Sequence, residues 1–293
     1  MERLGHDYEI YTTKVPMDAC AKIRADAETD ELRVYACGGD GTLNECVNGA
    51  AGLSGVSVTQ YPCGTGNDFI KAFAGDGRPF LDLEALIYGH VHPIDLINCN
   101  GRMSINICSA GFDARVAADV HKYSSLPLIG GKGGYIISLA ANFIKGVCQK
   151  LIIHSAAATF VGDTALVCAC NGNWYGGSFN PMPDAVPNDG YLDFLIVHKL
   201  SRLNFLKLVG KYAAGRYREL DGFLTYIRGK RLEVESEIPI AVNVDGESLI
   251  AKKLSFEIIP GGVNFIFPVG IDNFAASDTN SSDIWSNTEI SAG

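Results

Sequence analysis

The chain has 293 residues, of which 47% are apolar, so it can bury a sizeable core and form one large domain or two ordinary ones. Its net charge of −9 argues against a nucleic-acid-binding protein, because such proteins need a basic face to neutralise phosphates. We therefore expect two domains and no nucleic-acid partner.

Cysteine usage and hydropathy indicate the compartment. The nine cysteines are an odd number, lie mostly inside apolar runs and never form a Cys-x-x-Cys motif, which is typical of reduced thiols in the cytosol. The chain shows no signal peptide, and no uninterrupted apolar run approaches the ~20 residues of a membrane span. We expect a cytoplasmic protein whose contact with a membrane is peripheral.

The first part of the chain alternates strands with helices. The predicted strands are 8–12, 32–37 and 56–61, and the predicted helices are 18–28, one from Thr42, one from Phe69, and 79–89. Such alternation predicts a parallel, doubly wound sheet, whose ligands gather at the carboxyl ends of the strands.

From Ile94 the pattern changes to short strands separated by turns, beginning with a hairpin at Asn100-Gly101. The predicted strands are 94–99, 103–108, 151–160, 165–170, 191–197, 226–234, 240–244, 254–259 and 263–267, and the predicted helices are 114–122, 134–144 and 201–214. This pattern predicts an antiparallel β-sandwich. The expected domains are an α/β nucleotide-binding domain at 1–92, a β-sandwich at 93–270 and a disordered acidic tail at 271–293.

The helix predicted at 201–214 is basic and amphipathic. In its sequence, Arg202, Lys207 and Lys211 stand beside Leu203, Leu206 and Val209. Such a helix can lie on an anionic membrane surface. Equally, it can cover the sandwich and turn a solvated polar face outward.

A glycine loop, Gly38-Gly39-Asp40-Gly41-Thr42, joins a predicted strand to a predicted helix. Glycines let the backbone approach a ligand closely, and a helix N-terminus favours negative charge, so the expected ligand is a phosphate. The residue order matches neither the P-loop nor the dinucleotide motif. Asp40 would repel a phosphate unless a cation lay between them, which favours a bridging Mg²⁺. The alternative is an ordinary glycine turn without a ligand.

A second loop, residues 64–68, follows the next strand, so we expect it to face the same crevice. Thr65 and Asn67 can hydrogen-bond a ribose or a phosphate, and Asp68 can hold a loop or a metal-bound water. The alternative is that Asn67 and Asp68 only cap the following helix.

Two Asp-Gly pairs in the second half are either hairpin turns or parts of a site. Asp245 and Glu247 form an acidic pair that could supply a general base for an acceptor hydroxyl. Asp189 and Asp193 offer oxygen ligands suited to Mg²⁺. The loop at 171–177 is expected to be mobile, with two exposed aromatic side chains at a substrate mouth.

The succession of motifs resembles the catalytic domain of the diacylglycerol kinase family, in its branch of bacterial soluble lipid kinases. The motifs are Gly38-Gly39-Asp40-Gly41-Thr42-Leu43-Asn44-Glu45, Gly64-Thr65-Gly66-Asn67-Asp68, Asn171-Gly172 with Gly176-Gly177, Pro183-Asp184-Ala185, Asp189-Gly190-Tyr191-Leu192-Asp193 and Asp245-Gly246-Glu247. Gly-Gly-Asp-Gly also occurs in NAD kinases and phosphofructokinases, so the first motif indicates a superfamily and the later ones select the branch.

The resemblance implies a nucleotide-binding domain of the NAD kinase and phosphofructokinase type, followed by the β-sandwich. It further implies ATP-dependent phosphorylation of a lipid hydroxyl, with diacylglycerol as the expected substrate and phosphatidic acid as the product. A sphingoid base, another glycerolipid or an isoprenoid alcohol is the alternative acceptor. A non-catalytic nucleotide- or lipid-binding protein is the alternative from another class. The expected partners are ATP, a membrane lipid and, as an open alternative, a second copy of the chain.

Carried over by position, the resemblance also implies the site residues. The expected ATP contacts are Thr13, Gly38, Gly39, Asp40, Gly41, Thr42, Leu43, Asn44, Thr65, Asn67 and Asp68. Asp189, with the carbonyls of Val186 and Tyr191, would hold a structural Mg²⁺. Glu247 would be the proton acceptor, with Asp40 and Asp245 as rivals for that role.

One departure concerns the start of the chain. Members of the family usually open with a strand and an Asn-Pro-x-Ser-Gly loop, so the resemblance implies that the first strand of the sheet is absent here. Its loss should expose a backbone edge and weaken ATP binding.

Overall fold

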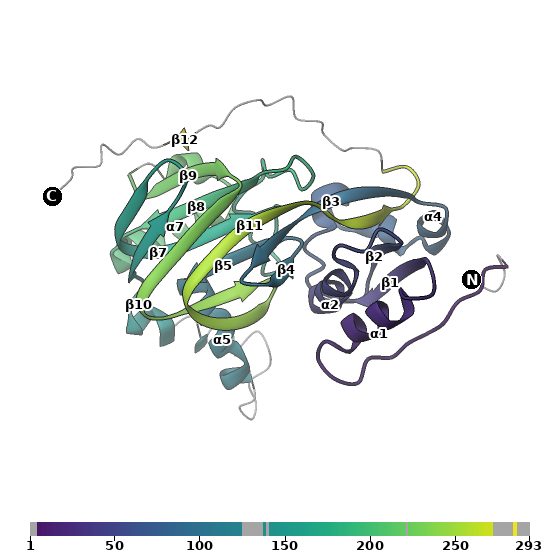
Figure 1. Ribbon diagram of the computed structural model, residues 1–293. Coiled ribbons are helices and arrows are strands. Elements are labelled where there is room, and N and C mark those ends of the chain that lie inside the picture. Colours follow the sequence, from purple (N-terminus) through teal and green to yellow (C-terminus); the bar gives the residue numbers. More distant parts are fainter. Residues whose placement is uncertain (1–4, 125–136, 139–140, 221, 272–283, 286–293) are drawn as a thin grey trace.

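The computed structural model describes residues 5–124, 137–138, 141–220, 222–271 and 284–285. Figure 1 shows a smaller unit built around α1, α2, β1 and β2 beside a larger unit made mainly of strands. This arrangement agrees with the prediction of an α/β region followed by a β-rich, sandwich-like region.

The smaller unit contains the predicted alternation of strands and helices. Its elements are α1 (Asp18–Asp26), β1 (Leu32–Gly38), α2 (Asp40–Ala50), β2 (Val56–Pro62), α3 (Lys71–Ala74), the 3₁₀ helix η2 (Arg78–Leu81) and α4 (Leu83–Ile87). β1 and β2 are parallel neighbours, with Leu32 opposite Val56 and Gly38 opposite Pro62. Both strands therefore end at the same edge, and both glycine loops begin there.

The larger unit is built from antiparallel strands and helices, and residues 137–138 and 141–145 are also helical. Its elements are β3 (His90–Cys99), β4 (Arg102–Ser104), β5 (Ile107–Gly111), α5 (Phe112–Ser124), β6 (Gln149–His154), β7 (Thr159–Cys170), β8 (Leu192–His198), α7 (Arg202–Ala213), the 3₁₀ helix η3 (Tyr217–Glu219), β9 (Leu224–Gly229), β10 (Arg231–Val244), β11 (Glu247–Phe267) and β12 (Ile284–Trp285). Along its main path the sheet runs β1-β2-β11-β10-β5-β7-β8-β9-β12.

Strand β11 belongs to both units. Its first part pairs antiparallel with β10, with Glu247 opposite Val244. Its last part pairs parallel with β2, with Phe265 opposite Val58, and antiparallel with β3. The end of β11 thus adds a third parallel strand to the α/β unit. A single strand with two sets of partners couples the units mechanically.

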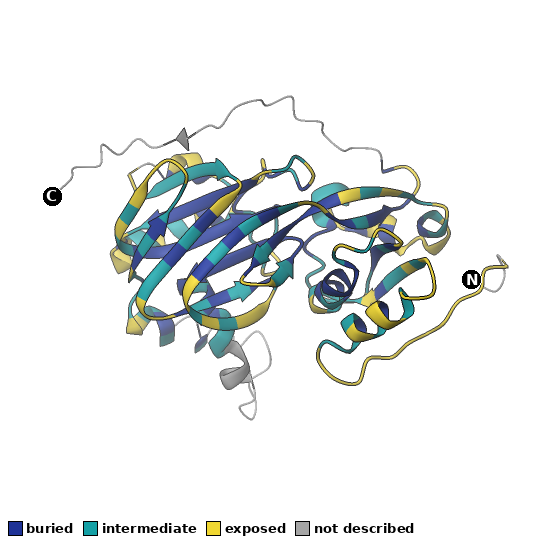
Figure 2. Ribbon diagram, in the orientation of Figure 1, coloured by how far each residue is buried: buried dark blue, intermediate teal, exposed yellow. Residues whose placement is uncertain are grey.

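Apolar side chains fill both units. Phe69, Phe80, Phe265 and Phe267 are fully buried in the core of the smaller unit, and pairs of them meet edge to face. Full burial of one such side chain stabilises a fold by roughly 1.5–3 kcal/mol. Figure 2 shows the buried positions concentrated along the inner strands and on α2. The core phenylalanines from β11 therefore tie the late part of the chain to the early part.

The strand predicted at 8–12 is absent, and the segment runs in extended coil over α1. The Tyr11 hydroxyl and the Lys14 N–H both donate to the Asp18 carboxylate, at 2.9 and 2.8 Å. Ile10 is 80% exposed. A strand needs a hydrogen-bonded neighbour, and β1, the nearest sheet edge, pairs only with β2 among the described residues.

Some predicted elements are divided in the structure. The helix predicted at 79–89 is interrupted at Asp82, whose carboxylate caps α4 by accepting from the Ala85 N–H at 3.0 Å. A turn at 155–158 separates β6 from β7 within the strand predicted at 151–160, and the predicted strand 226–234 is divided between β9 and β10. In the helix predicted at 134–144, the residues that the structure describes, 137–138 and 141–144, are helical, as expected. Most of the tail at 271–293 lies outside the described residues.

Candidate active site

The two glycine loops meet at Asp40, the first residue of α2. Asp40 Oδ2 accepts a hydrogen bond from the Asn67 N–H at 2.9 Å, and Oδ1 accepts one from the Asp68 N–H at 2.6 Å. The carboxylate therefore joins the second loop to the N-terminus of α2. Asp40, a predicted site residue, thus joins the two glycine loops.

Glycine is required where these loops touch. A Cβ atom on Gly64 would overlap the Cα of Gly39, and a Cβ on Gly66 would overlap the Asp40 carboxylate. Asn67 adopts a left-handed conformation, with φ of 52°, and donates from Nδ2 to the Gly64 carbonyl at 2.8 Å. Close backbone approach of this kind leaves N–H groups available for a phosphate.

Asp68 connects the second loop to the larger unit. Its buried carboxylate accepts from Lys71 Nζ at 2.6 Å and from the Gly177 N–H at 2.8 Å. Lys71 also donates to the Gly177 carbonyl at 2.8 Å, and its ammonium lies 5.8 Å from the Trp174 ring centroid. The sequence analysis missed Lys71, although its position three residues after Asp68 in a helical segment was a usable signal.

Asp245 is the centre of the contact between α2, β4 and the hairpin that joins β10 to β11. Five groups donate to its carboxylate, namely Ser104 Oγ at 2.6 Å, Ile105 N at 2.8 Å, Asn44 Nδ2 at 3.0 Å, Ile107 N at 3.1 Å and Asn106 N at 3.2 Å. Burial raises the pKa of Asp245, and the hydrogen bonds from Ser104 and Ile105 oppose that rise. With both oxygens saturated, Asp245 is suited to positioning and poorly suited to taking up a proton.

Glu247 lies at the same hairpin in a contrasting environment. Its side chain is exposed and has no hydrogen-bond partner among the residues that the structure describes. Asn44, which donates to Asp245, lies one helical turn after Asp40 on α2. Glu247 follows Asp245 by two residues, and the hydrogen bond from Asn44 to Asp245 places the hairpin that carries the candidate base against α2.

The crevice carries an excess of negative charge. Burial raises the pKa of Asp40, and the neighbouring Asp68 and Asp245 add to that rise, whereas the two backbone N–H groups lower it. Lys71 is paired with Asp68. In the described part of the chain, no group of three His, Cys, Asp or Glu side chains could hold a metal ion by itself. A divalent cation bound beside Asp40 would therefore need further oxygen ligands from a phosphate.

Two other predicted nucleotide contacts, Thr65 and Thr13, lie in exposed segments. Thr65 is exposed on the second loop, at the crevice. Thr13 lies in the exposed segment before α1 and makes no hydrogen bond to either glycine loop within the described ranges. The assignment of Thr13 to the nucleotide stays a prediction.

The structure gives Asp189 a partner other than a metal. Its Oδ2 accepts from Arg228 at 2.5 Å, and its Oδ1 accepts from the Tyr191 N–H at 2.9 Å. Both charged side chains are 11% exposed, and the guanidinium lies 5.1 Å from the Tyr191 ring centroid. Burial raises the pKa of Asp189, and Arg228 opposes that rise. This arrangement does not fit a structural Mg²⁺ held by Asp189 and the carbonyls of Val186 and Tyr191, because the cationic position is already filled.

Replacing Arg228 with glutamine should lower the free energy of unfolding by roughly 3–5 kcal/mol, because it leaves a buried carboxylate without its counter-charge. EDTA should leave the thermal unfolding of the wild-type protein unchanged. The exposed Arg231, which pairs with Glu233, provides the control, and its replacement with glutamine should have almost no effect. If EDTA destabilises the wild-type protein and the Arg228 substitution leaves stability unchanged, the pairing of Asp189 with Arg228 in place of a metal is contradicted.

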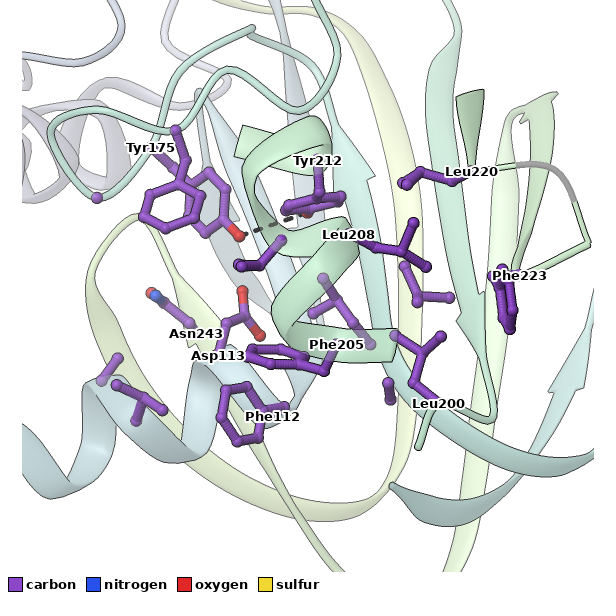
Figure 3. A pocket seen from close by; sticks show the side chains of 18 residues that line it. Phe112, Asp113, Tyr175, Leu200, Phe205, Leu208, Tyr212, Leu220, Phe223 and Asn243 are labelled. Atoms are coloured by element: carbon purple, nitrogen blue, oxygen red, sulfur yellow. Dashed lines mark hydrogen bonds between the residues drawn. The ribbon is translucent and has the colours of Figure 1, made fainter. Parts of the chain in front are cut away.

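An apolar cavity of about 140 Å³ lies in the larger unit, between α5, α7 and the sheet. Its polar lining groups are Asp113, Tyr175, Tyr212 and Asn243, and Figure 3 shows the first three gathered near one another. Asn243 Oδ1 accepts from the Gly246 N–H at 2.7 Å, so one wall of the cavity continues into the acidic hairpin. An apolar space with a few polar groups is the usual form of a small-molecule site.

The loop at 171–177 is more fixed than the sequence analysis expected. Asn173 Nδ2 donates to the carbonyls of Met182, Pro183 and Ala185 at 2.9–3.1 Å. Trp174 and Tyr175 are half-buried, so the expectation of two exposed aromatic side chains was wrong. The Tyr175 hydroxyl points into the protein and donates to the Tyr212 hydroxyl at 3.4 Å.

Asp113 should make stability depend on pH. Burial raises the pKa of Asp113 from 3.8 to about 6. Because the folded pKa exceeds the unfolded one, the native state binds more protons in that interval, and stability falls as the pH rises through it. Between about pH 4 and about pH 7, the free energy of unfolding should fall less in Asp113→Asn than in the wild-type protein. Urea denaturation at several pH values measures this difference. Equal pH dependence in both proteins would contradict a buried, ionising Asp113.

Among the described residues, no helix combines the length and the apolar character needed to cross a bilayer.

Comparison with known proteins covers most of the chain. Residues 1–99 match the diacylglycerol kinase catalytic domain, and residues 106–267 match the YegS C-terminal NAD kinase beta sandwich-like domain. A "Probable lipid kinase YegS-like" of Shewanella frigidimarina is 28% identical over 268 residues, which cover 90% of this chain and 85% of that protein. A "Putative lipid kinase" of Staphylococcus aureus is 26% identical over 249 residues, which cover 84% and 81%.

A solved structure supports the same relationship. The structure described as "a putative diacylglycerol kinase" from Bacillus anthracis superposes with a TM-score of 0.70 at 25% identity. The superposition covers 88% of this chain and 84% of that one. The matched ranges therefore include both glycine loops and the acidic hairpin.

Proposed function

Because the chain belongs to the family of diacylglycerol kinase catalytic domains with a YegS-type C-terminal domain, we propose that it transfers the γ-phosphate of ATP to a lipid hydroxyl. Diacylglycerol is the proposed acceptor, and phosphatidic acid the product. Membership of a lipid kinase family implies a phosphotransferase that uses ATP; the identity of the lipid is the proposal made here.

The observation that carries the proposal is the hydrogen bond from Asn44 to Asp245 at 3.0 Å. It joins the helix that begins at the phosphate loop to the hairpin that carries Glu247. Phosphoryl transfer needs little covalent participation by the protein and depends on positioning and charge neutralisation. In the proposed site, the phosphate-binding loop and the hairpin that carries Glu247 supply the positioning, because Asn44 and Asp245 join them.

In the proposed mechanism, the backbone N–H groups of residues 38–42 and the N-terminus of α2 bind the phosphates of ATP. Asp40 holds the second loop against α2 and would supply a carboxylate to a cation that accompanies the nucleotide. Mg²⁺, when bound with ATP, neutralises phosphate charge. Glu247 accepts the proton of the lipid hydroxyl as the oxygen attacks the γ-phosphate.

The apolar cavity supports a lipid acceptor. It is lined mainly by aliphatic and aromatic side chains, including Phe112, Leu166 and Phe205. An apolar cavity of about 150 Å³ is large enough to bind benzene, so this one has room for part of an alkyl chain. Its wall reaches the acidic hairpin through Asn243. We therefore assign the cavity to the acyl chain of the acceptor lipid.

The test is incubation with γ-labelled ATP and a panel of lipids in mixed micelles, namely diacylglycerol, monoacylglycerol, a sphingoid base and a long-chain isoprenoid alcohol. We expect label in phosphatidic acid. If label appears only in another lipid, the protein is a lipid kinase whose acceptor is that lipid and not diacylglycerol. If no lipid is labelled although the protein binds ATP and lipid, the chain is a binding protein and the proposal fails.

A further inference from the structure

Helix α7 presents two different faces. Phe205, Leu208, Val209 and Tyr212 line the apolar cavity, and their spacing places them on one side of the helix. Figure 3 shows α7 crossing the cavity with Phe205, Leu208 and Tyr212 directed into it. The helix is therefore one wall of the cavity, and its opposite face is turned to solvent.

That outer face carries large apolar side chains. Leu203 is 62% exposed and Leu206 is 61% exposed, and neither lines the cavity. Ile144, which is 73% exposed, lies close by, since the Arg202 guanidinium donates to its carbonyl at 2.7 Å. A single exposed leucine needs no explanation, but three exposed aliphatic side chains beside a cavity wall indicate a binding surface.

Positive charge accompanies these side chains. α7 contains Arg202, Lys207 and Lys211 and no acidic residue, in a chain whose net charge is −9. Arg202 bonds only to carbonyl oxygens, and Lys207 has no ion-pair partner among the described residues, whereas Lys211 pairs with Glu219 at 3.2 Å. Much of the charge on this helix is therefore not neutralised by the protein, and an anionic surface would complement it.

We propose that the outer face of α7, defined as Leu203, Leu206 and Lys207 together with Ile144, docks on an anionic phospholipid bilayer. The leucines enter the boundary between headgroups and acyl chains, and the lysine contacts anionic headgroups. The wall of the cavity then lies at the membrane surface, where a lipid can enter from the bilayer. The route of lipid entry rests on the proposed function, whereas docking does not.

The experiment is co-sedimentation of the full chain with phosphatidylcholine vesicles, with and without phosphatidylglycerol. We expect the wild-type protein to pellet with the anionic vesicles, and binding to weaken as salt rises. The double variant Leu203→Ser/Leu206→Ser should bind at least about tenfold more weakly, and Lys207→Glu should weaken binding to anionic vesicles only. Unchanged thermal unfolding of these variants shows that they fold.

The matched control is Leu81→Ser/Leu83→Ser. These leucines are 47% and 37% exposed and lie in η2 and α4, at the other end of the molecule from α7 in Figure 1. This variant should bind vesicles like the wild-type protein. If it loses binding to the same extent, binding is not specific to α7 and the proposal is overturned.

Activity assays separate docking from catalysis. With lipid presented in detergent micelles, Leu203→Ser/Leu206→Ser should keep its turnover, and it should lose turnover only on vesicles. If the wild-type protein binds anionic vesicles and phosphorylates no lipid, the proposed function fails and the docking surface stands. If the variant binds vesicles normally, or if its only change is dissociation of a dimer, the docking surface is overturned.

Discussion

Replacing Asp40 with alanine should reduce lipid phosphorylation by at least about 10³-fold, the largest effect that we expect from a single substitution. In the proposed mechanism, the substitution removes the carboxylate that would neutralise a phosphate-bound cation. It also leaves the N–H groups of Asn67 and Asp68 without their acceptor, so the second loop loses its attachment to α2. The measurement is steady-state kinetics with ATP and diacylglycerol in mixed micelles.

A second variant separates charge from structure. Asp40→Asn keeps the size of the side chain and one accepting oxygen but sets an amide NH₂ against one of the two N–H donors, so it should lose roughly 1–3 kcal/mol of stability, stay folded and still show a large loss of turnover. Asp30→Asn, which changes an exposed carboxylate in the same unit, serves as the control and should be fully active. Near-normal turnover in Asp40→Ala would refute the assignment of this crevice as the active site.

Replacing Glu247 with glutamine should lower kcat by roughly 10²- to 10⁴-fold and leave the KM for ATP almost unchanged. The physical reason is that the amide cannot accept the hydroxyl proton. Because Glu247 is exposed and has no hydrogen-bond partner among the described residues, its replacement should not affect the free energy of unfolding. The exposed Glu237 offers a matched control, and Glu237→Gln should behave as wild type.

Asp245 provides the contrast that distinguishes base from positioning residue. Asp245→Asn places an amide NH₂ where N–H and O–H groups donate. It should therefore lower both the free energy of unfolding and the turnover rate. Glu247→Gln should lose turnover and keep its free energy of unfolding, whereas Asp245→Asn should lose both. An active Glu247→Gln, with an Asp245→Asn of native stability that has lost turnover, would reverse the two roles.

The sequence alone determined the local features of the candidate site. Glycines before and after Asp40 and around Asn67 predicted the two loops, because only glycine allows the backbone contact seen between Gly39 and Gly64. The Asp245-Gly246 pair predicted a tight hairpin, and both residues adopt positive φ angles there. These conformations depend on neighbouring residues, which the sequence displays directly.

Contacts between distant residues could not be predicted in this way. Ser104 and Asp245 are 141 residues apart, and Asp68 and Gly177 are 109 apart. The Arg228 partner of Asp189 lies 39 residues further along the chain, on β9, and nothing in the motif around Asp189 indicates it. The role of β11 in both units likewise depends on which strands are available to pair with each of its halves.

The segment at 8–12 also shows that distant contacts decide the structure. Its composition predicts a strand, but a strand forms only when another backbone supplies hydrogen bonds, and in the structure Tyr11 and Lys14 bond to Asp18 instead. The sequence by itself thus determined the glycine loops, the hairpin and the alternation of elements, because these follow from local backbone preferences. Only the tertiary structure decided the partners of Asp189, Asp245 and β11 and the cavity under α7, because these depend on contacts between parts of the chain that are far apart in sequence.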